Sequence, residues 1–118
     1  VALGTLNDVQ FGPVIMVAAG GVLVELLEDR AFALCPVDAA EAEAMLVSLK
    51  LDAVLKGMRG QAAVNRQALI EIIVGLSQFA FAMREQIAEI DINPVLVNQQ
   101  HALAVDALII SKPVEASC

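Results

Sequence analysis

The stretch from Glu89 to Asp106 reads EIDINPVLVNQQHALAVD, and it places polar side chains where a buried strand would carry only apolar ones. Side chains of a strand point alternately to its two faces, so Glu89, Asp91 and Asn93 share one face and the two isoleucines between them share the other. The polar turn at 98–101 allows the chain to return antiparallel, which brings Asp106 beside this row. We therefore predict a row of acidic and amide side chains on one surface of a sheet.

Such a row suits a hard cation. Mg²⁺ favours oxygen ligands, keeps several waters, and often takes only one or two protein carboxylates together with substrate phosphates. Asp91, Asn93 and Asp106 are the candidate metal ligands, and the chemistry that they would support is phosphoryl transfer, in which a metal ion neutralises developing charge. The alternative is a solvated sheet face on which Asn93-Pro94 ends a strand, because carboxylates are common on exposed surfaces. Spacing alone leaves both interpretations open.

The composition favours a small domain with more apolar surface than it needs. A chain of 118 residues has the size of one domain, and we expect residues 1–118 to form a single domain. Hydrophobic residues make up 58% and mean hydropathy is +0.74. The longest uncharged run, 9–24, is interrupted by Gly12, Pro13, Gly20 and Gly21, so we expect no membrane span. We expect some apolar faces to be covered by a partner chain, by the rest of a larger enzyme or by a homo-oligomer.

The charge and the cysteines exclude further classes of function. The net charge is −7 with only seven scattered basic residues, which argues against a nucleic-acid surface. Cys35 and Cys118 form neither a metal spacing nor a disulfide framework, and no export signal pattern is present, so we expect a cytoplasmic protein. Neither Cys35 nor Ser77 has a candidate base nearby in the sequence. We therefore propose no catalytic nucleophile.

Apolar runs and turn residues predict the secondary structure. The opening residues 1–8 carry no signal to which we assign a role, and short strands are predicted over 14–19, 22–28 and 31–35. Asp38 begins a helix that runs to about Lys50, with Glu41 completing a capping box. Residues 51–63 are expected to be irregular.

A second helix starts at Asn65 and continues to about Met83, and the two strands around Glu89–Asp106 follow. Its apolar stripe is expected to include Leu69, Ile73 and Phe79. This order predicts an α+β fold with two main helices on one face of a mostly antiparallel sheet.

Four further features carry open alternatives. Gly20-Gly21 can present amides to a phosphate or can form a plain hairpin turn. Arg59, between two glycines, suits a phosphate or carboxylate, or else a surface salt bridge. Glu25 interrupts an apolar run, so its carboxylate either faces a site or meets a cation. His101 stands alone in a polar turn and is interpreted as a solvated loop residue.

The sequence resembles the C-terminal lobe of the ATP-grasp domain in NDP-forming acyl-CoA synthetases, the group that includes ADP-forming acetyl-CoA synthetase and the succinyl-CoA synthetases. The resemblance covers nearly the whole chain and rests on the order and spacing of short motifs. These motifs are FGPVIM at 11–16, GG at 20–21, VEL at 24–26, DRAF at 29–32, GMRG at 57–60, EIDINP at 89–94 and AVDA at 104–107.

The resemblance implies part of a large enzyme that interconverts acyl-CoA, ADP and phosphate with the acid, CoA and ATP through an acyl phosphate and a phosphohistidine. It implies Asn93 and Asp106 as Mg²⁺ ligands at the ATP/ADP site, with Asp91 as an acidic neighbour. Glu25 and Arg59 fall in recurring motifs and are the candidate nucleotide-binding residues.

The other half of the grasp, the CoA-binding domain and the phosphorylated histidine have no counterpart in this sequence, and His101 does not match that histidine. We therefore expect the remaining domains or a further subunit of the synthetase as partners, and no synthetase activity from this chain alone. The alternative function is a synthetase-like regulatory region of a bacterial protein lysine acetyltransferase. An appended acetyltransferase domain would distinguish the two.

Overall fold

Five antiparallel strands form the main sheet, in the order β3-β2-β1-β4-β7, and a separate hairpin joins β5 to β6. The computed structural model describes residues 1–19, 29–57 and 63–113. The strands of the sheet and hairpin are β1 (Ala2–Asp8), β2 (Gly12–Ala18), β3 (Arg30–Leu34), β4 (Ile87–Ile92), β5 (Val95–Val97), β6 (Ala102–Ala104) and β7 (Ala107–Ser111). The helices are α2 (Ala39–Val47), α3 (Leu51–Leu55) and α4 (Arg66–Ala82).

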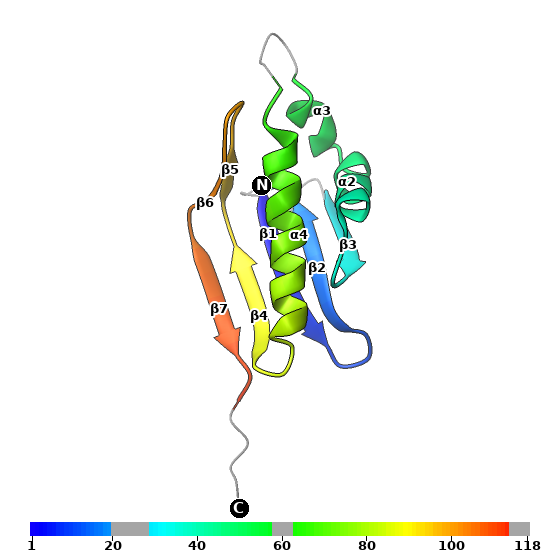
Figure 1. Ribbon diagram of the computed structural model, residues 1–118, viewed down its shortest axis with the longest axis vertical. Helices are drawn as coiled ribbons and strands as arrows, with labels where there is room; N and C mark the ends of the chain where they lie inside the picture. Colours follow the sequence, from blue (N-terminus) through cyan, green and yellow to red (C-terminus); the bar gives the residue numbers. More distant parts are fainter. Residues whose placement is uncertain (20–28, 58–62, 114–118) are drawn as a thin grey trace, which may run out of the picture.

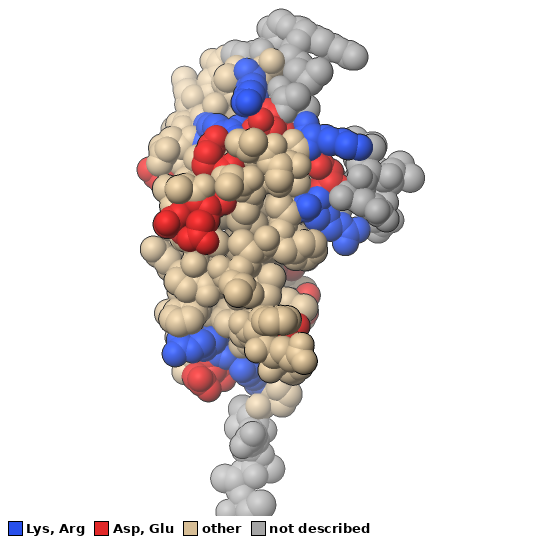
Figure 2. Space-filling view, turned by 90° about the vertical axis from the view of Figure 1, so that its right-hand side faces the viewer, with Lys and Arg blue, Asp and Glu red and all other residues tan. Residues whose placement is uncertain are grey.

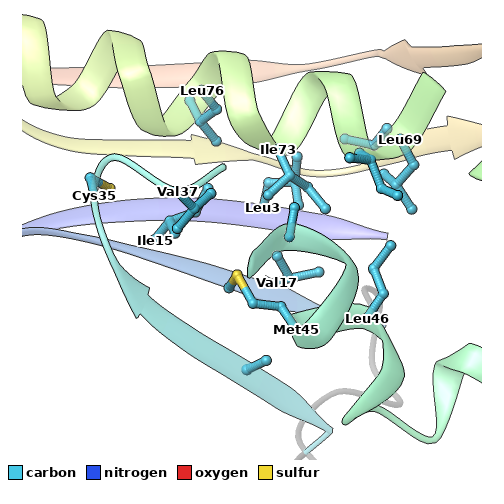
Figure 3. Packing of buried hydrophobic residues seen from close by; sticks show 14 of the residues in the cluster. Leu3, Ile15, Val17, Cys35, Val37, Met45, Leu46, Leu69, Ile73 and Leu76 are labelled. Atoms are coloured by element: carbon cyan, nitrogen blue, oxygen red, sulfur yellow. The ribbon is translucent and has the colours of Figure 1, made fainter. Parts of the chain in front are cut away.

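The helices α2 and α4 lie on one face of the sheet, as Figure 1 shows. The predicted α+β architecture, with two main helices on one side of an antiparallel sheet, is therefore confirmed. We call the face under these helices the covered face and the opposite face the open face. Between the helices and the sheet lies an aliphatic core. Figure 3 shows Leu69 and Ile73 of α4 and Leu46 of α2 directed toward Leu3 and Val17 of the central strands.

Local capping signals define where both main helices begin. The Asp38 side chain accepts from the Glu41 amide at 2.7 Å, and the Glu41 carboxylate accepts from the Asp38 amide at 3.2 Å, which completes the predicted capping box. The Asn65 side chain accepts from the Ala68 amide at 3.0 Å. Both predicted helix starts are confirmed. They could be predicted from the sequence because each capping bond joins residues only three positions apart.

The buried side of α4 differs at its C-terminal end from the predicted stripe. Leu69 and Ile73 are fully buried as expected, but Phe79 is 43% exposed. Ser77 and Ala80 occupy the buried positions there instead. Small side chains allow this end of the helix to approach the sheet closely, and the larger ring is turned away from it.

Two segments without a local signal are ordered parts of the fold. Residues 2–8, to which we assigned no role, form β1, the central strand of the sheet. The segment 51–63, predicted to be irregular, contains the short helix α3. The Asp29 carboxylate accepts from the amides of Lys50 and Leu51, both at 2.9 Å, and so caps α3 from a distant part of the sequence. Gly57, with φ +94°, follows the end of α3.

Each of the two predicted final strands is divided in two. β4 ends at Ile92 and β5 begins at Val95, while β6 ends at Ala104 and β7 begins at Ala107. β4 and β7 belong to the main sheet, and β5 and β6 form the hairpin with the predicted turn at 98–101. The division comes at Asn93-Pro94, where proline cannot donate to a ladder.

Several predictions fall on residues outside the described ranges. These are the strand at 22–28, the turn at Gly20-Gly21, and the candidate binding residues Glu25 and Arg59. Within the ranges that are described, none of the helices has both the length and the apolar character needed to cross a membrane.

Candidate functional site

The predicted row of polar side chains lies on the open face along β4. Glu89, Asp91 and Asn93 are exposed, whereas Ile90 is only 2% exposed and faces the helices. The alternation follows from the strand geometry, and the helices decide which set is buried. The predicted shared surface is confirmed for Glu89 and Asp91, which line one hollow, whereas Asn93 is exposed at the first position after β4.

Asn93 and Asp106 are neighbours across two adjacent strands. β4 and β7 pair antiparallel with Ile92 opposite Ala107, which places Asn93 opposite Asp106 one position further on. The Asn93 amide donates to the Asp106 carbonyl at 3.2 Å and fixes this pairing. Both side chains are exposed, and this bond brings the two residues side by side where β4 ends and β7 begins.

A hollow of about 390 Å³ lies on the open face beside Asp91. Strands β1, β2, β3 and β4 all contribute to it, so it crosses the middle of the sheet. Its lining combines aliphatic and aromatic side chains with three carboxylates, and consists of Gly4, Thr5, Leu6, Asp8, Val14, Met16, Phe32, Glu89, Ile90 and Asp91. An apolar floor with a few polar groups at its border is typical of small-molecule sites.

Asp91 connects this hollow to the Asn93–Asp106 pair. It lines the hollow, lies two residues before Asn93, which directly follows β4, and is opposite Gly4 of β1. A Cβ atom at Gly4 would stand 3.4 Å from the Ile90 carbonyl and 3.7 Å from the Met16 terminal methyl group. Both are ordinary contact distances, and with glycine at this position no β1 side chain covers the sheet beside Asp91.

The donor chemistry fits Mg²⁺ better than an ion that needs a complete protein cage. Two carboxylates and one amide supply only oxygen atoms. Among the residues that the structure describes, no three His, Cys, Asp or Glu side chains gather closely enough to hold a metal. A magnesium ion with few protein ligands is consistent with this, because it completes its coordination with water and phosphate oxygens.

Sequence reasoning missed the side chains that β1, β2 and β3 contribute to the hollow. Leu6, Met16 and Phe32 belong to strands that each carry apolar residues toward both faces. The only available signal was the alternation of Gly4 and Leu6 with Leu3 and Thr5 in β1, and this pattern does not say which set faces the core.

The other polar candidates have structural roles. The Ser77 hydroxyl accepts from the Val37 amide at 3.0 Å and donates to the Val74 carbonyl at 2.8 Å. Burial raises the pKa of the Cys35 thiol to about 11, which leaves it unreactive near neutral pH. His101 is exposed, and its backbone amide donates to the Asn98 side chain in the β5–β6 turn.

An ion cluster joins helices α2, α3 and α4. The Arg66 guanidinium of α4 binds Glu43 of α2 with Nε–O distances of 3.0 and 2.9 Å, and also pairs with Asp52 of α3. Lys56 binds the same Asp52 carboxylate at 3.0 Å. The hydrogen bond from Lys56, reinforced by Arg66, lowers the pKa of Asp52. On the face drawn in Figure 2, most of the charged side chains lie above or below a largely uncharged band.

Comparison with known proteins identifies the family. The sequence profile of the ATP-grasp domain matches residues 1–110. The beta subunit of an ADP-forming acetate–CoA ligase from Pyrococcus furiosus is 41% identical over 110 residues, which cover 93% of this chain and 47% of that subunit. An ADP-forming 4-hydroxybutyrate–CoA ligase from Nitrosopumilus maritimus is 42% identical over 98 residues, covering 83% of this chain and 14% of that enzyme.

Solved structures agree with the sequence relatives. A dinucleotide-forming acetyl-coenzyme A synthetase from Candidatus Korarchaeum cryptofilum, in complex with coenzyme A and Mg-AMPPCP, superimposes with a TM-score of 0.89 at 36% identity. The match covers 94% of this chain and 52% of that one. The chain thus spans about half the length of the subunits that it matches. It belongs to the ATP-grasp domain family, in the form of that domain found in ADP-forming acid–CoA ligases.

Proposed function

We propose that this chain supplies the magnesium-binding half of the nucleotide site in an ADP-forming acyl-CoA synthetase. The observation that carries the proposal is the pairing of Asn93 with Asp106 across β4 and β7, two residues along the chain from Asp91, which borders a hollow. Support also comes from the related synthetase that was solved with Mg-AMPPCP and coenzyme A.

Asn93 and Asp106 would hold the metal, with Asp91 as their acidic neighbour. The bound metal would offset the negative charge on the phosphates of ATP during phosphoryl transfer. The chain itself would position the metal. The pairing of β4 with β7 holds the two ligands side by side, and the packed core on the covered face holds the sheet rigid. Rigid placement of this kind is the main contribution of a protein to phosphoryl transfer.

The acidic character of the open face implies that other parts of the synthetase contribute to binding ATP. The hollow is lined by Asp8, Glu89 and Asp91, without a Lys or Arg among its lining residues, so it would repel an unaccompanied triphosphate. The positive charge that neutralises ATP would be supplied by the metal ion and by the remaining domains or subunit of the synthetase. Glu25 and Arg59 stay candidate nucleotide-binding residues on the strength of their motifs.

The test is made in the intact synthetase that contains this chain. Asp106→Ala is expected to reduce the Mg²⁺-dependent transfer of the γ-phosphate from ATP to the enzyme at least 100-fold, because it removes a metal ligand from the transfer site. Phosphorylation is followed with γ-labelled ATP, and thermal unfolding checks that the variant is folded.

Glu71→Ala is the matched control, because Glu71 is an exposed carboxylate on α4, away from the open face. This variant is expected to keep normal phosphorylation. If folded Asp106→Ala transfers phosphate at the wild-type rate, the assignment of Asp106 as a metal ligand is wrong.

A further inference from the structure

The strand β7 forms an outer edge of the sheet and is apolar from Ala107 to Ile110, with the uncharged Ser111 as its last residue. All five of its residues are exposed, including Leu108 at 60%, Ile109 at 51% and Ile110 at 44%. Figure 1 shows β7 at the margin of the sheet, beside β4 and away from α4. An exposed apolar edge strand is a template for pairing with another strand, since its outward backbone groups are free to bond.

The hydrogen bonds to β4 show which backbone groups of β7 point outward. The Asp106 carbonyl accepts from the Asn93 amide at 3.2 Å, and the Lys112 amide donates to the Gln86 carbonyl at 2.7 Å. Successive residues of an antiparallel strand direct these groups to alternate sides. Ala107, Ile109 and Ser111 therefore direct their N–H and C=O groups away from β4.

We propose that β7 pairs antiparallel with β7 of a second copy of this chain, with the two-fold axis at Ile109. In this register Ala107 stands opposite Ser111 of the second copy and Leu108 opposite its Ile110. The register follows from charge, because it alone places Asp106 opposite Lys112 of the second copy at both ends of the uncharged strand ALIIS.

The pairing covers apolar surface on both sides of the joined sheets. Leu108 and Ile110 are opposite Asp91 and Glu89 of β4 and so lie on the open face, whereas Ile109 is opposite Ile90 on the covered face. Since each copy uses the same edge, the contact is isologous and closes at two copies. The expected product is a dimer in which two five-stranded sheets become continuous.

This inference does not depend on the proposed nucleotide site, although both involve Asp106. The experiment therefore uses the chain of 118 residues in EDTA, so that no divalent metal competes for this carboxylate. Sedimentation equilibrium over a concentration series is expected to show a monomer–dimer equilibrium. Lys112→Asp, which sets two carboxylates against each other at each end, is expected to weaken the dimer at least about tenfold.

Two further variants make the charge test specific. Lys50→Asp makes the same change of charge at an exposed site on another part of the molecule, and should leave the dimer unchanged. The double variant Asp106→Lys/Lys112→Asp exchanges the charges and should restore association to within about threefold of the wild type. An effect of Lys50→Asp equal to that of Lys112→Asp would show that only net charge matters and would overturn the proposal.

Ile109→Pro tests the backbone pairing directly. It removes an outward N–H while leaving the bonds to β4 in place, and proline is tolerated at such edge positions. Circular dichroism verifies the fold, and the folded variant is expected to be monomeric. Two results would contradict the proposed β7 dimer. One is a wild-type chain that is monomeric at every concentration, and the other is a folded Ile109→Pro variant that dimerises as strongly as the wild type.

Discussion

The two faces of the sheet are built from the same strands and both carry large apolar side chains, but only one of them is covered by helices. On the covered face Leu3 and Ile15 are fully buried beneath the helices. On the open face Leu6 is 57% exposed and Phe32 is 63% exposed, and carboxylates stand among them. Apolar content alone therefore does not tell which side of a strand forms the core. What distinguishes the open face is the acidic row along β4.

The largest expected difference between the faces concerns stability. Leu3→Ala should lower the free energy of unfolding by about 3 kcal/mol, because a fully buried leucine leaves a cavity beneath α4. Leu6→Ala, on the same strand but on the open face, should change it by less than about 1 kcal/mol. Urea unfolding followed by circular dichroism measures both. Equal losses for the two variants would show that the open face contributes to the core of this chain as much as the covered face does.

The local sequence could predict the features that depend on neighbouring residues. The starts of α2 and α4 follow from Asp38 with Glu41 and from Asn65, whose side chains bind amides only three residues away. The separation of the polar row from Ile90 follows from the period of a strand. These features need no knowledge of the rest of the fold.

The features that sequence reasoning missed depend on distant contacts. Strand β1 is central because it pairs with both β2 and β4, and nothing in its own alternation indicates this. Helix α3 is capped by Asp29, more than 20 positions earlier than the amides that it binds. The hollow likewise combines residues from four strands. Only the polar side chains of β4 could be predicted, because they lie together in one stretch of sequence.

A smaller effect, dependent on pH, is expected from the ion cluster beside the covered face. Hydrogen bonds from Lys56 and Arg66 lower the pKa of Asp52 below its ordinary value of 3.8. A carboxyl whose pKa is lower in the folded state stabilises the fold above the pKa of the unfolded state, and this contribution is lost as the pH falls through the folded-state pKa. Asp52→Asn should therefore be less stable than the wild type near pH 7, with the difference shrinking below about pH 4.

Urea unfolding of the two proteins across this pH range measures the difference. Glu85→Gln is a suitable control, because Glu85 is exposed and lies outside the ion pairs described for the chain. It should follow the wild-type profile. A stability difference for Asp52→Asn that stays constant from pH 7 to pH 3 would contradict the role given to the lowered pKa.

The smallest effect is expected on the open face itself, at Glu89. This residue lies in the same row as Asp91 and lines the hollow, but it is opposite Leu6 and Ile110, four positions away from the Asn93–Asp106 pair. Successive positions on one face of a strand are about 7 Å apart, so a metal held by Asn93 and Asp106 is beyond direct reach of Glu89. Glu89→Gln should therefore change the free energy of unfolding by no more than about 0.5 kcal/mol. In the intact synthetase it should leave Mg²⁺-dependent phosphorylation within about twofold of the wild type, under conditions in which Asp106→Ala reduces it at least 100-fold. A loss at Glu89 as large as that at Asp106 would instead show that the whole acidic row acts as one charged cluster, in which position along β4 does not matter.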